Sequence, residues 1–375
     1  MTELTVTPQA FPLIEVSGPP AERGRQYGRQ AAERIHLGAG HYTEQLERLS
    51  LTRAALEKVV NDYLPVIEKF DATYVEEMRG IAQGADISFV DVMLLNARTE
   101  ILKLAASPKL RETMRLDEED GCTGLVVLPQ RSLDGTLIHA QNWDWKLECA
   151  ETSVVLRIRR DDGPDILTFT EAGGLARSGM NDAGIGLTAN FLESDQDFKR
   201  IGVPLPLIRR KVLEQEHLAL AYRAVYATAK SGSNNMIVSH AGGVALNFEC
   251  APDETFPLQP ESGLLVHANH WVSPVALTKL KDTGILSTPD TLYRDVRVRD
   301  LLLSRGDRVG IDDVKAALLD DFAKPWSVCR PPRLNLASNL SATVATVVMT
   351  PAHGRMEIVP LPALGAPFTV YGFAD

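Results

Sequence analysis

A change of pattern near residue 122 constrains the fold of this chain more than any other sequence feature. Residues from about 20 to 115 carry helical signals, with helix-forming residues and apolar positions at helical spacing. After this point short β-prone runs take over. The first two, at 124–128 and 136–139, are separated by Leu133-Asp134-Gly135, a hairpin-type turn. The sequence therefore predicts a mostly helical first third followed by a sheet.

The rest of the chain mixes strands in hairpins with pairs of helices. Further strands are predicted at 153–159, 166–170, 184–189, 236–239, 244–248, 264–267, 342–349 and 356–360. Further helices are predicted at 204–218, 219–230, 290–305 and 312–321. This grouping favours a layered α+β architecture over alternating βαβ units.

Composition and charge exclude several classes of function. The 375 residues are 45% hydrophobic and 23% charged, which is typical of a globular protein. Lys and Arg number 39 against 49 Asp and Glu, a net charge of −10, and no basic block interrupts this background. Nucleic acid is therefore not an expected partner. No apolar run approaches the roughly 18 residues of a membrane span, and an acid stands near the start where a secretory signal has basic residues. We expect a soluble, cytoplasmic protein with no membrane partner.

The four cysteines lie far apart and form no C-x-x-C pair. They are Cys122, Cys149, Cys250 and Cys329. Neither a disulfide framework nor a thiolate zinc site is expected from this spacing. Free cysteines are most often small buried hydrophobes, and we interpret the last three as structural.

Cys122 differs because of its neighbours. It lies in Asp120-Gly121-Cys122-Thr123-Gly124, where the helical pattern gives way to the sheet, after the acidic stretch 117–120. This stretch predicts an exposed connector that leads into a strand. A thiol at the start of a strand can attack the carbonyl of the residue before it, and Gly121 tolerates the strained backbone that such an attack needs. The product would be a thioester and then a cut chain.

Hydrolysis of that thioester would make Cys122 a new N-terminus that carries a thiol and a free α-amine. An α-amine titrates near pH 8 in reference peptides, so it can accept the thiol proton, and no catalytic histidine is required. The pentapeptide alone leaves an alternative open, because a buried structural cysteine after a turn glycine is the more common arrangement.

Several motifs carry a family resemblance that covers most of the chain. They are residues 18–28 (GPPAERGRQYG), 77–101 (EMRGIAQGADISFVDVMLLNARTEI), 120–123, 141–144 (QNWD), 179–184 (GMNDAG), 267–270 (HANH) and 327–330 (SVCR). In this order they resemble the acyl-coenzyme A:6-aminopenicillanic acid acyltransferase family of N-terminal-nucleophile (Ntn) hydrolases. Choloylglycine hydrolases and acid-ceramidase-type amidases are more distantly similar.

The resemblance implies a fold and a division of the chain. The family's cut falls before the cysteine, which implies a helical prosegment or α-chain of residues 1–121 and a β-chain of residues 122–375. The two pieces would be partners of each other within one Ntn-hydrolase domain. It also implies the αββα sandwich, in which two sheets lie between two helical layers.

The resemblance also assigns roles to three residues besides Cys122. Asp144 matches a carboxylate beside the N-terminal amine, Asn269 an amide that donates to the oxyanion, and Arg330 an arginine near the thiol. The alternatives are a turn aspartate at Asp144 and a solvated surface arginine at Arg330. The histidines that flank Asn269 lack a clear third ligand, so we expect no metal there.

Substrate contacts are implied at Thr123, Trp143, Asn190 and Ser327. Gln141 stands where the choloylglycine branch carries arginine, which argues against that branch. No cofactor is expected, and an assembly of identical chains is compatible with the sequence.

The resulting hypothesis is a self-cleaving cysteine amidohydrolase or acyltransferase. Cys122 would take the acyl group of an N-acyl amine or an acyl thioester and pass it to water or an amine. Nothing in the sequence specifies a β-lactam acceptor, so we favour hydrolysis of a small N-acyl or β-alanyl amine over penicillin-type transfer from acyl-coenzyme A. Two further hypotheses stay open: a non-catalytic binding relative, and an uncut papain-like hydrolase that pairs Cys122 with a histidine such as His267.

Overall fold

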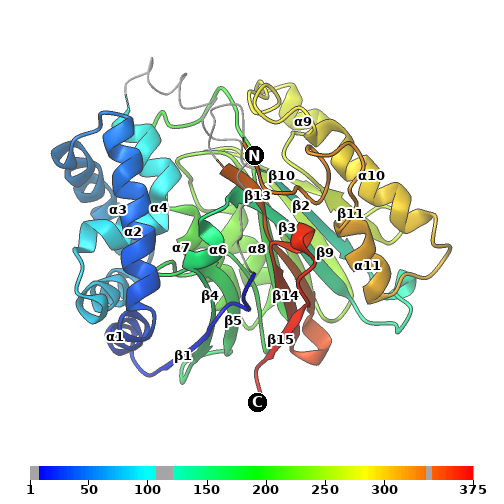
Figure 1. Ribbon diagram of the computed structural model, residues 1–375, viewed down its shortest axis with the longest axis horizontal. Coiled ribbons are helices and arrows are strands. Elements are labelled where there is room, and N and C mark those ends of the chain that lie inside the picture. Colours follow the sequence, from blue (N-terminus) through cyan, green and yellow to red (C-terminus); the bar gives the residue numbers. More distant parts are fainter. Residues whose placement is uncertain (1–7, 107–120, 335–339, 375) are drawn as a thin grey trace.

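Helices cover both outer faces of two stacked β-sheets in the computed structural model, which describes residues 8–106, 121–334 and 340–374 (Figure 1). The acidic stretch 117–120, including Asp120 of the cleavage motif, lies outside the described residues. One helical layer consists of α1 (Pro20–Gln30), α2 (Ala32–Arg48), α3 (Arg53–Ala85), α4 (Phe89–Ala105), α7 (Leu205–Leu213) and α8 (Leu218–Tyr226). The opposite layer contains α10 (Thr291–Leu303) and α11 (Ile311–Leu318). The short helices α6 (Cys149–Thr152) and α9 (Pro274–Leu277) lie in connections.

The first sheet has eight strands in the order β1-β4-β5-β6-β7-β8-β9-β10. They are β1 (Leu13–Ser17), β4 (Ser153–Arg159), β5 (Ile166–Glu171), β6 (Ser178–Asn181), β7 (Ile185–Phe191), β8 (Asn234–His240), β9 (Val244–Cys250) and β10 (Thr255–Leu258). β1 pairs with β4 in parallel, and the other neighbours are antiparallel.

The second sheet has the strand order β11-β2-β3-β13-β14-β15, with β12 paired to β13. Its strands are β2 (Gly121–Val127), β3 (Ile138–Lys146), β11 (Leu264–His267), β12 (Arg333–Leu334), β13 (Leu340–Thr350), β14 (Arg355–Pro360) and β15 (Thr369–Gly372). β2 lies between β11 and β3, so its residues have strand partners on both sides.

Alternation along β2 divides its side chains between two interfaces. Cys122 and Val126 belong to apolar clusters between the two sheets, whereas Leu125 and Val127 pack with residues of α10 and α11. Successive side chains of a strand point to opposite faces, which explains the division. A third core joins α1–α4, α7 and α8 to the outer face of the first sheet. These interfaces make four layers in the order α, β, β, α, as predicted.

The predicted elements agree with the structure except at a few places. All of the strands predicted from residue 124 onward are present, and the runs at 124–128 and 136–139 pair as an antiparallel hairpin. Three predictions were wrong in detail. The 136–139 run continues to Lys146, the predicted helix 204–218 ends at Leu213, and the helical first third also contains β1. Strands β6, β10, β12 and β15, each of four residues or fewer, were missed.

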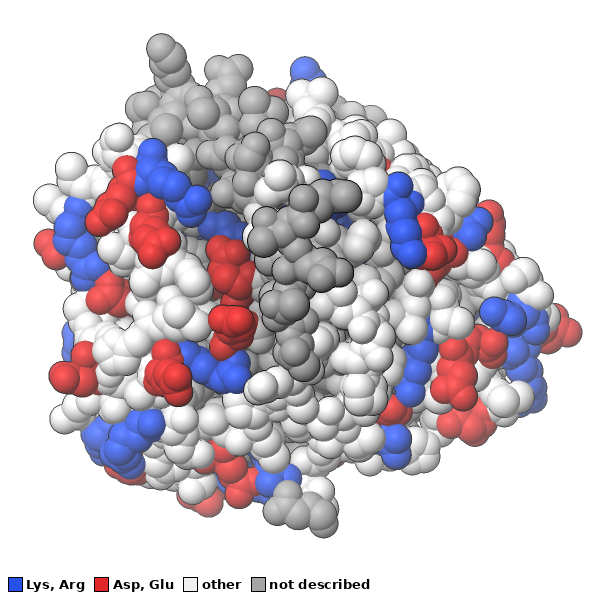
Figure 2. All heavy atoms as spheres, in the orientation of Figure 1, with Lys and Arg blue, Asp and Glu red and all other residues white. Residues whose placement is uncertain are grey.

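The surface carries charges of both signs. On the face drawn in Figure 2, Lys and Arg lie among Asp and Glu, and the described residues form no continuous basic surface there. None of the helices in the described part of the chain is both long enough and apolar enough to cross a bilayer.

Candidate active site

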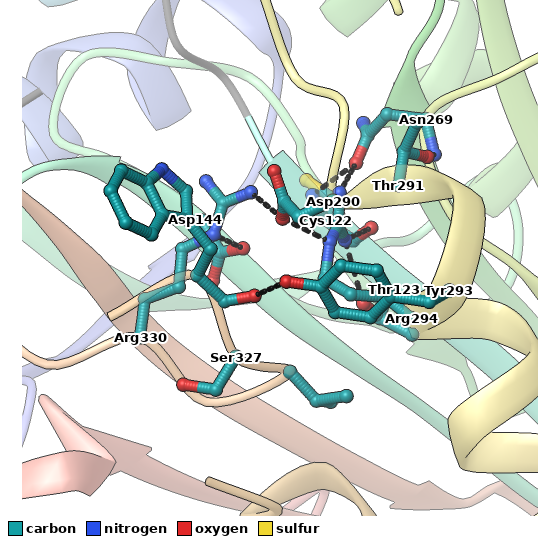
Figure 3. A network of polar contacts seen from close by, with 12 residues as sticks. Cys122, Thr123, Asp144, Asn269, Asp290, Thr291, Tyr293, Arg294, Ser327 and Arg330 are labelled. Atoms are coloured by element: carbon teal, nitrogen blue, oxygen red, sulfur yellow. Dashed lines mark hydrogen bonds and ion pairs between the residues drawn. The ribbon is translucent and has the colours of Figure 1, made fainter. Parts of the chain in front are cut away.

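Cys122 lies at the buried start of β2. Its side chain has no exposed surface, and Trp143 of β3 lies opposite it in the strand register. The backbone N–H of Cys122 donates a 2.7 Å hydrogen bond to Oδ1 of Asn269 (Figure 3). The peptide nitrogen that would become the new α-amine therefore already has a defined acceptor.

Asn269 follows β11, the strand that pairs with β2, and several contacts fix its orientation. Its Oδ1 accepts from Cys122 and also from Nη2 of Arg294, at 2.8 Å, while its Nδ2 donates to the Phe191 carbonyl at 2.9 Å. Its backbone N–H donates to the Thr291 hydroxyl at 2.7 Å. In this uncut chain the side-chain oxygen of Asn269, rather than its amide nitrogen, faces Cys122.

Arg294, which the sequence analysis missed, contacts both Cys122 and Thr123. It comes from α10, has no exposed surface, and its Nη1 donates to the Cys122 carbonyl at 2.6 Å and to the Thr123 hydroxyl at 2.9 Å. Its Nε donates to Asp290 at 2.7 Å. An Asp and an Arg four residues apart share a helix face, so this spacing in the predicted 290–305 helix was a readable signal for the pair.

Asp290 connects Arg294 to Arg330. Its Oδ2 accepts from both guanidinium groups, and all three side chains are at most 3% exposed. Burial alone would raise the pKa of Asp290, but the charges of Arg294 and Arg330 lower it. The carboxylate therefore compensates two buried cations, which would otherwise carry a large desolvation cost. Arg330 is a buried member of the network, so the solvated alternative for this residue is wrong.

Asp144 and Arg330 meet beside Gly121. Asp144 lies within β3, opposite Gly121, so the turn alternative for it is wrong. Its Oδ1 accepts from the Thr343 hydroxyl at 2.6 Å, and its Oδ2 lies 3.4 Å from Nε of Arg330. A Cβ at position 121 would lie 2.6 Å from Oδ2 of Asp144 and 2.5 Å from Nη1 of Arg330. A side chain at this position would require the buried ends of Asp144 and Arg330 to move.

Arg177, which the sequence analysis also missed, contacts the sulfur. Its Nη2 lies 3.7 Å from Sγ of Cys122, and its guanidinium lies 4.1 Å from the centroid of the Trp143 ring. A cation beside a sulfur stabilises negative charge on it. Nothing in the local sequence distinguishes Arg177, because its proximity arises from packing of the two sheets.

Asn190 and Ser327 hold segments near the site. Nδ2 of Asn190 donates to the carbonyls of His267 and Ala268, at 2.8 and 3.0 Å, and its Oδ1 accepts from Gln141 at 2.7 Å. Asn190 thus fixes the segment that leads to Asn269. The hydroxyl of Ser327 donates to the Cys329 carbonyl within its own loop.

His267 does not face the thiol of Cys122. Its Nε2 lies 2.8 Å from the Glu249 carboxylate and its Nδ1 lies 2.9 Å from the Ala268 carbonyl. Burial opposes a charge on this ring, but the hydrogen bond to Glu249 and its charge raise the pKa of His267. This geometry does not support His267 as the base of a papain-like mechanism. Within the described ranges, no three His, Cys, Asp or Glu side chains are grouped so that they could hold a metal ion.

The other three cysteines are buried. Burial raises the pKa of Cys329 to about 12 and also raises those of Cys149 and Cys250. Such thiols are poor nucleophiles at neutral pH, in agreement with a structural interpretation.

Known proteins resemble this chain in sequence and in fold. The family model for acyl-coenzyme A:6-aminopenicillanic acid acyl-transferase matches residues 131–360. The 40 kDa form of acyl-coenzyme A:6-aminopenicillanic-acid-acyltransferase from Emericella nidulans is 26% identical over 327 residues, which cover 84% of each chain.

Two solved structures are similar to this chain at low sequence identity, and the first of them shares its Ntn-hydrolase fold. A variant of conjugated bile acid hydrolase from Clostridium perfringens is 14% identical with a TM-score of 0.50, over 67% of this chain and 92% of that one. Penicillin V acylase from Agrobacterium tumefaciens is 13% identical with a TM-score of 0.44, over 68% and 87%. Because the family model spans more than half of the residues, the chain belongs to the acyl-coenzyme A:6-aminopenicillanic acid acyl-transferase family.

Proposed function

We propose that the protein cuts itself before Cys122 and then works as an Ntn cysteine amidohydrolase. The observation that carries this proposal is the environment of the Gly121–Cys122 peptide. Asn269 accepts a hydrogen bond from its nitrogen, and the side chains of Asp144 and Arg330 crowd the place that a Cβ on Gly121 would take. A structural cysteine needs neither a fixed amide hydrogen bond to a buried asparagine nor a charged network around the preceding glycine.

The proposed cleavage is an acyl shift followed by hydrolysis. The Cys122 sulfur attacks the Gly121 carbonyl carbon, a C–S bond forms, and the C–N bond breaks. The nitrogen takes up the thiol proton and becomes the α-amine. Water then cleaves the thioester, which releases the Gly121 carboxylate and returns the thiol.

In the proposed catalytic cycle the α-amine of Cys122 takes the thiol proton, and the sulfur attacks the substrate carbonyl. The protonated amine then donates that proton to the leaving amine. Oδ1 of Asn269 holds the amine in position, because it already accepts from the same nitrogen in the uncut chain. Asp144 and Arg330 surround the space at Gly121 that cleavage opens, and Arg177 stabilises negative charge on the sulfur. The side-chain amide of Asn269 is also proposed to donate to the oxyanion, as the family resemblance implies.

Hydrolysis of a small N-acyl or β-alanyl amine is the outcome we favour. The second candidate is acyl transfer from an acyl thioester to an amine, and the 26% identity to an acyltransferase from Emericella nidulans supports it. The outcome depends on how well the site excludes water and binds the acceptor.

The state of the purified protein tests the cleavage. Intact-mass analysis and N-terminal sequencing are expected to give two pieces in place of one chain of 41.1 kDa, with a new N-terminus that reads Cys-Thr-Gly-Leu. Incubation with N-acyl amines, including β-alanyl and phenylacetyl donors, and with acyl thioesters then separates hydrolysis from transfer by mass spectrometry of the products. An active preparation that retains the intact Gly121–Cys122 bond would contradict the proposal.

Gly121→Ala is expected to slow cleavage by at least about tenfold, which corresponds to about 1.4 kcal/mol in the barrier. The added Cβ would overlap the groups of Asp144 and Arg330 that line the peptide. A time course of intact mass after expression measures the rate. The matched control is Gly40→Ala in α2, where a Cβ has no neighbour within 4 Å and cleavage should keep its unmodified rate. Equal rates for Gly121→Ala and the unmodified chain would show that the close fit is irrelevant.

A further inference from the structure

A cavity next to Cys122 contains more positive charge than its surroundings compensate. It lies between α4, α7 and the adjacent ends of β7 and β8, and it is partly open to solvent. Its charged lining residues are Arg98, Glu100, Arg177 and Arg209. Arg177 also lies 3.7 Å from Sγ of Cys122, so this arginine contacts both the cavity and the sulfur.

Arg209 is the unusual member of this group. Its side chain belongs to α7 and is 7% exposed, and no residue in the described ranges forms a hydrogen bond or ion pair with it. Burial and the neighbouring Arg177 lower the pKa of Arg209 to about 9. A buried, unpaired guanidinium is costly for a folded protein, which indicates that a ligand supplies the missing negative charge.

The two acidic groups nearby have other partners. Arg98 forms an ion pair with Glu171, which also accepts from the Tyr42 hydroxyl. Glu100 accepts from the backbone N–H of Leu205 at 3.0 Å. Among the described residues, no carboxylate lies within ion-pair distance of Arg177 or Arg209. The positive charge without an ion pair is therefore concentrated at these two arginines, although the charge of Glu100 acts on Arg209 and that of Glu171 on Arg177 over a longer distance.

The apolar part of the remaining lining suits a short carbon chain. Its apolar residues include Leu95, Phe191, Phe198 and Leu205. Because Arg177 contacts the sulfur, Arg209 is the arginine that could bind one further negative charge in the cavity. A single carboxylate matches one guanidinium fork in both charge and shape.

We propose that Arg209 binds a carboxylate carried by the substrate, at the end remote from the amide bond that Cys122 attacks. This inference rests on the proposed function, because it assumes that Cys122 is the nucleophile. It narrows the substrate class to N-acyl amines that carry a carboxylate on either the acyl group or the amine.

Matched substrates distinguish these two positions. In the first pair, glutaryl-p-nitroanilide carries the carboxylate on its acyl group, and its terminal carboxamide is the neutral control. In the second pair, N-butyryl-p-aminobenzoate carries the carboxylate on its amine, and the corresponding benzamide is the neutral control. For the pair whose carboxylate reaches Arg209, kcat/KM of the carboxylate is expected to exceed that of the carboxamide by about 10- to 100-fold. Arg209→Gln should reduce this preference to below about threefold, and Arg209→Lys should restore part of it.

A second readout does not depend on turnover. N-(Bromoacetyl)-β-alanine and its carboxamide both alkylate thiols, and peptide mass spectrometry follows the reaction at Cys122. The ratio of the carboxylate rate to the carboxamide rate should fall at least fivefold in Arg209→Gln.

Equal rates for both members of every pair in the unmodified protein, or a preference that survives Arg209→Gln, would overturn the inference. Failure of the proposed function would look different, because the chain would stay uncut. The alkylation ratio would still report on Arg209 in that case, since an uncut chain also carries the Cys122 thiol.

Discussion

Cys122→Ala is expected to leave a single uncut chain of 41.1 kDa and to abolish turnover of N-acyl amines. Alanine has no nucleophile for the Gly121 carbonyl, and without cleavage no α-amine is released to act as the base. Cys122→Ser keeps a weaker nucleophile in the same place and is expected to cleave slowly. Denaturing gels and intact mass follow the cleavage, and product formation from an N-acyl amine follows the turnover.

Cys250→Ala is the matched control for the loss of a buried thiol. Cys250 lies at the end of β9, where its sulfur donates to the Phe248 carbonyl and burial raises its pKa. This variant should cleave and turn over substrate like the unmodified protein. Cleavage in Cys122→Ala, or loss of cleavage in Cys250→Ala alone, would rule out Cys122 as the nucleophile.

Asn269→Ala is expected to lower turnover by about 10²-fold or more and to slow cleavage as well. The substitution removes the oxygen that accepts from Cys122 and from Arg294, so both donors lose a buried partner. Asn269→Asp separates the two proposed roles, because it keeps the accepting oxygen but removes the amide donor. We expect Asn269→Asp to cleave faster than Asn269→Ala, although it loses the donor to the Phe191 carbonyl, yet to turn over substrate about 10²-fold more slowly than the unmodified protein.

Cleavage time courses and kcat/KM for one N-acyl amine test both substitutions. Full activity in Asn269→Asp would exclude the oxyanion role of the amide nitrogen. Unmodified cleavage in Asn269→Ala would exclude the role of the oxygen in holding the Cys122 nitrogen. Circular dichroism and thermal unfolding separate these effects from a failure to fold.

The sequence predicted those parts of the fold that depend on local pattern. The run at 153–159 appears as β4 with the same limits, and Asn269 lies just after β11 as predicted. Local sequence also indicated Gly121 and Cys122 as the candidate cleavage site, because a glycine and a cysteine at a change of pattern are visible without any tertiary contact. The structure contains them at the start of β2.

Contacts between distant segments could not be predicted in this way. Arg177 and Arg294 reach Cys122 across 55 and 172 residues of sequence, and no local spacing encodes either contact. The position of Asp144 within a strand was also not predicted from the sequence. Apolar and polar residues alternate in β3 from Ile138 to Gln141 and again from Asn142 to Lys146, but the phase shifts between Gln141 and Asn142, so the sequence does not show one continuous strand.

The placement of β1 has a consequence for the cut protein. This strand precedes the cleavage point, yet it forms the edge of the first sheet by pairing with β4, and α1–α4 share one core with strands that follow the cut. Cleavage would therefore turn a single folding unit into a tight complex of two polypeptides without separating them. The free energy of unfolding of such a complex depends on protein concentration, and its components, once dispersed, must find each other again by diffusion.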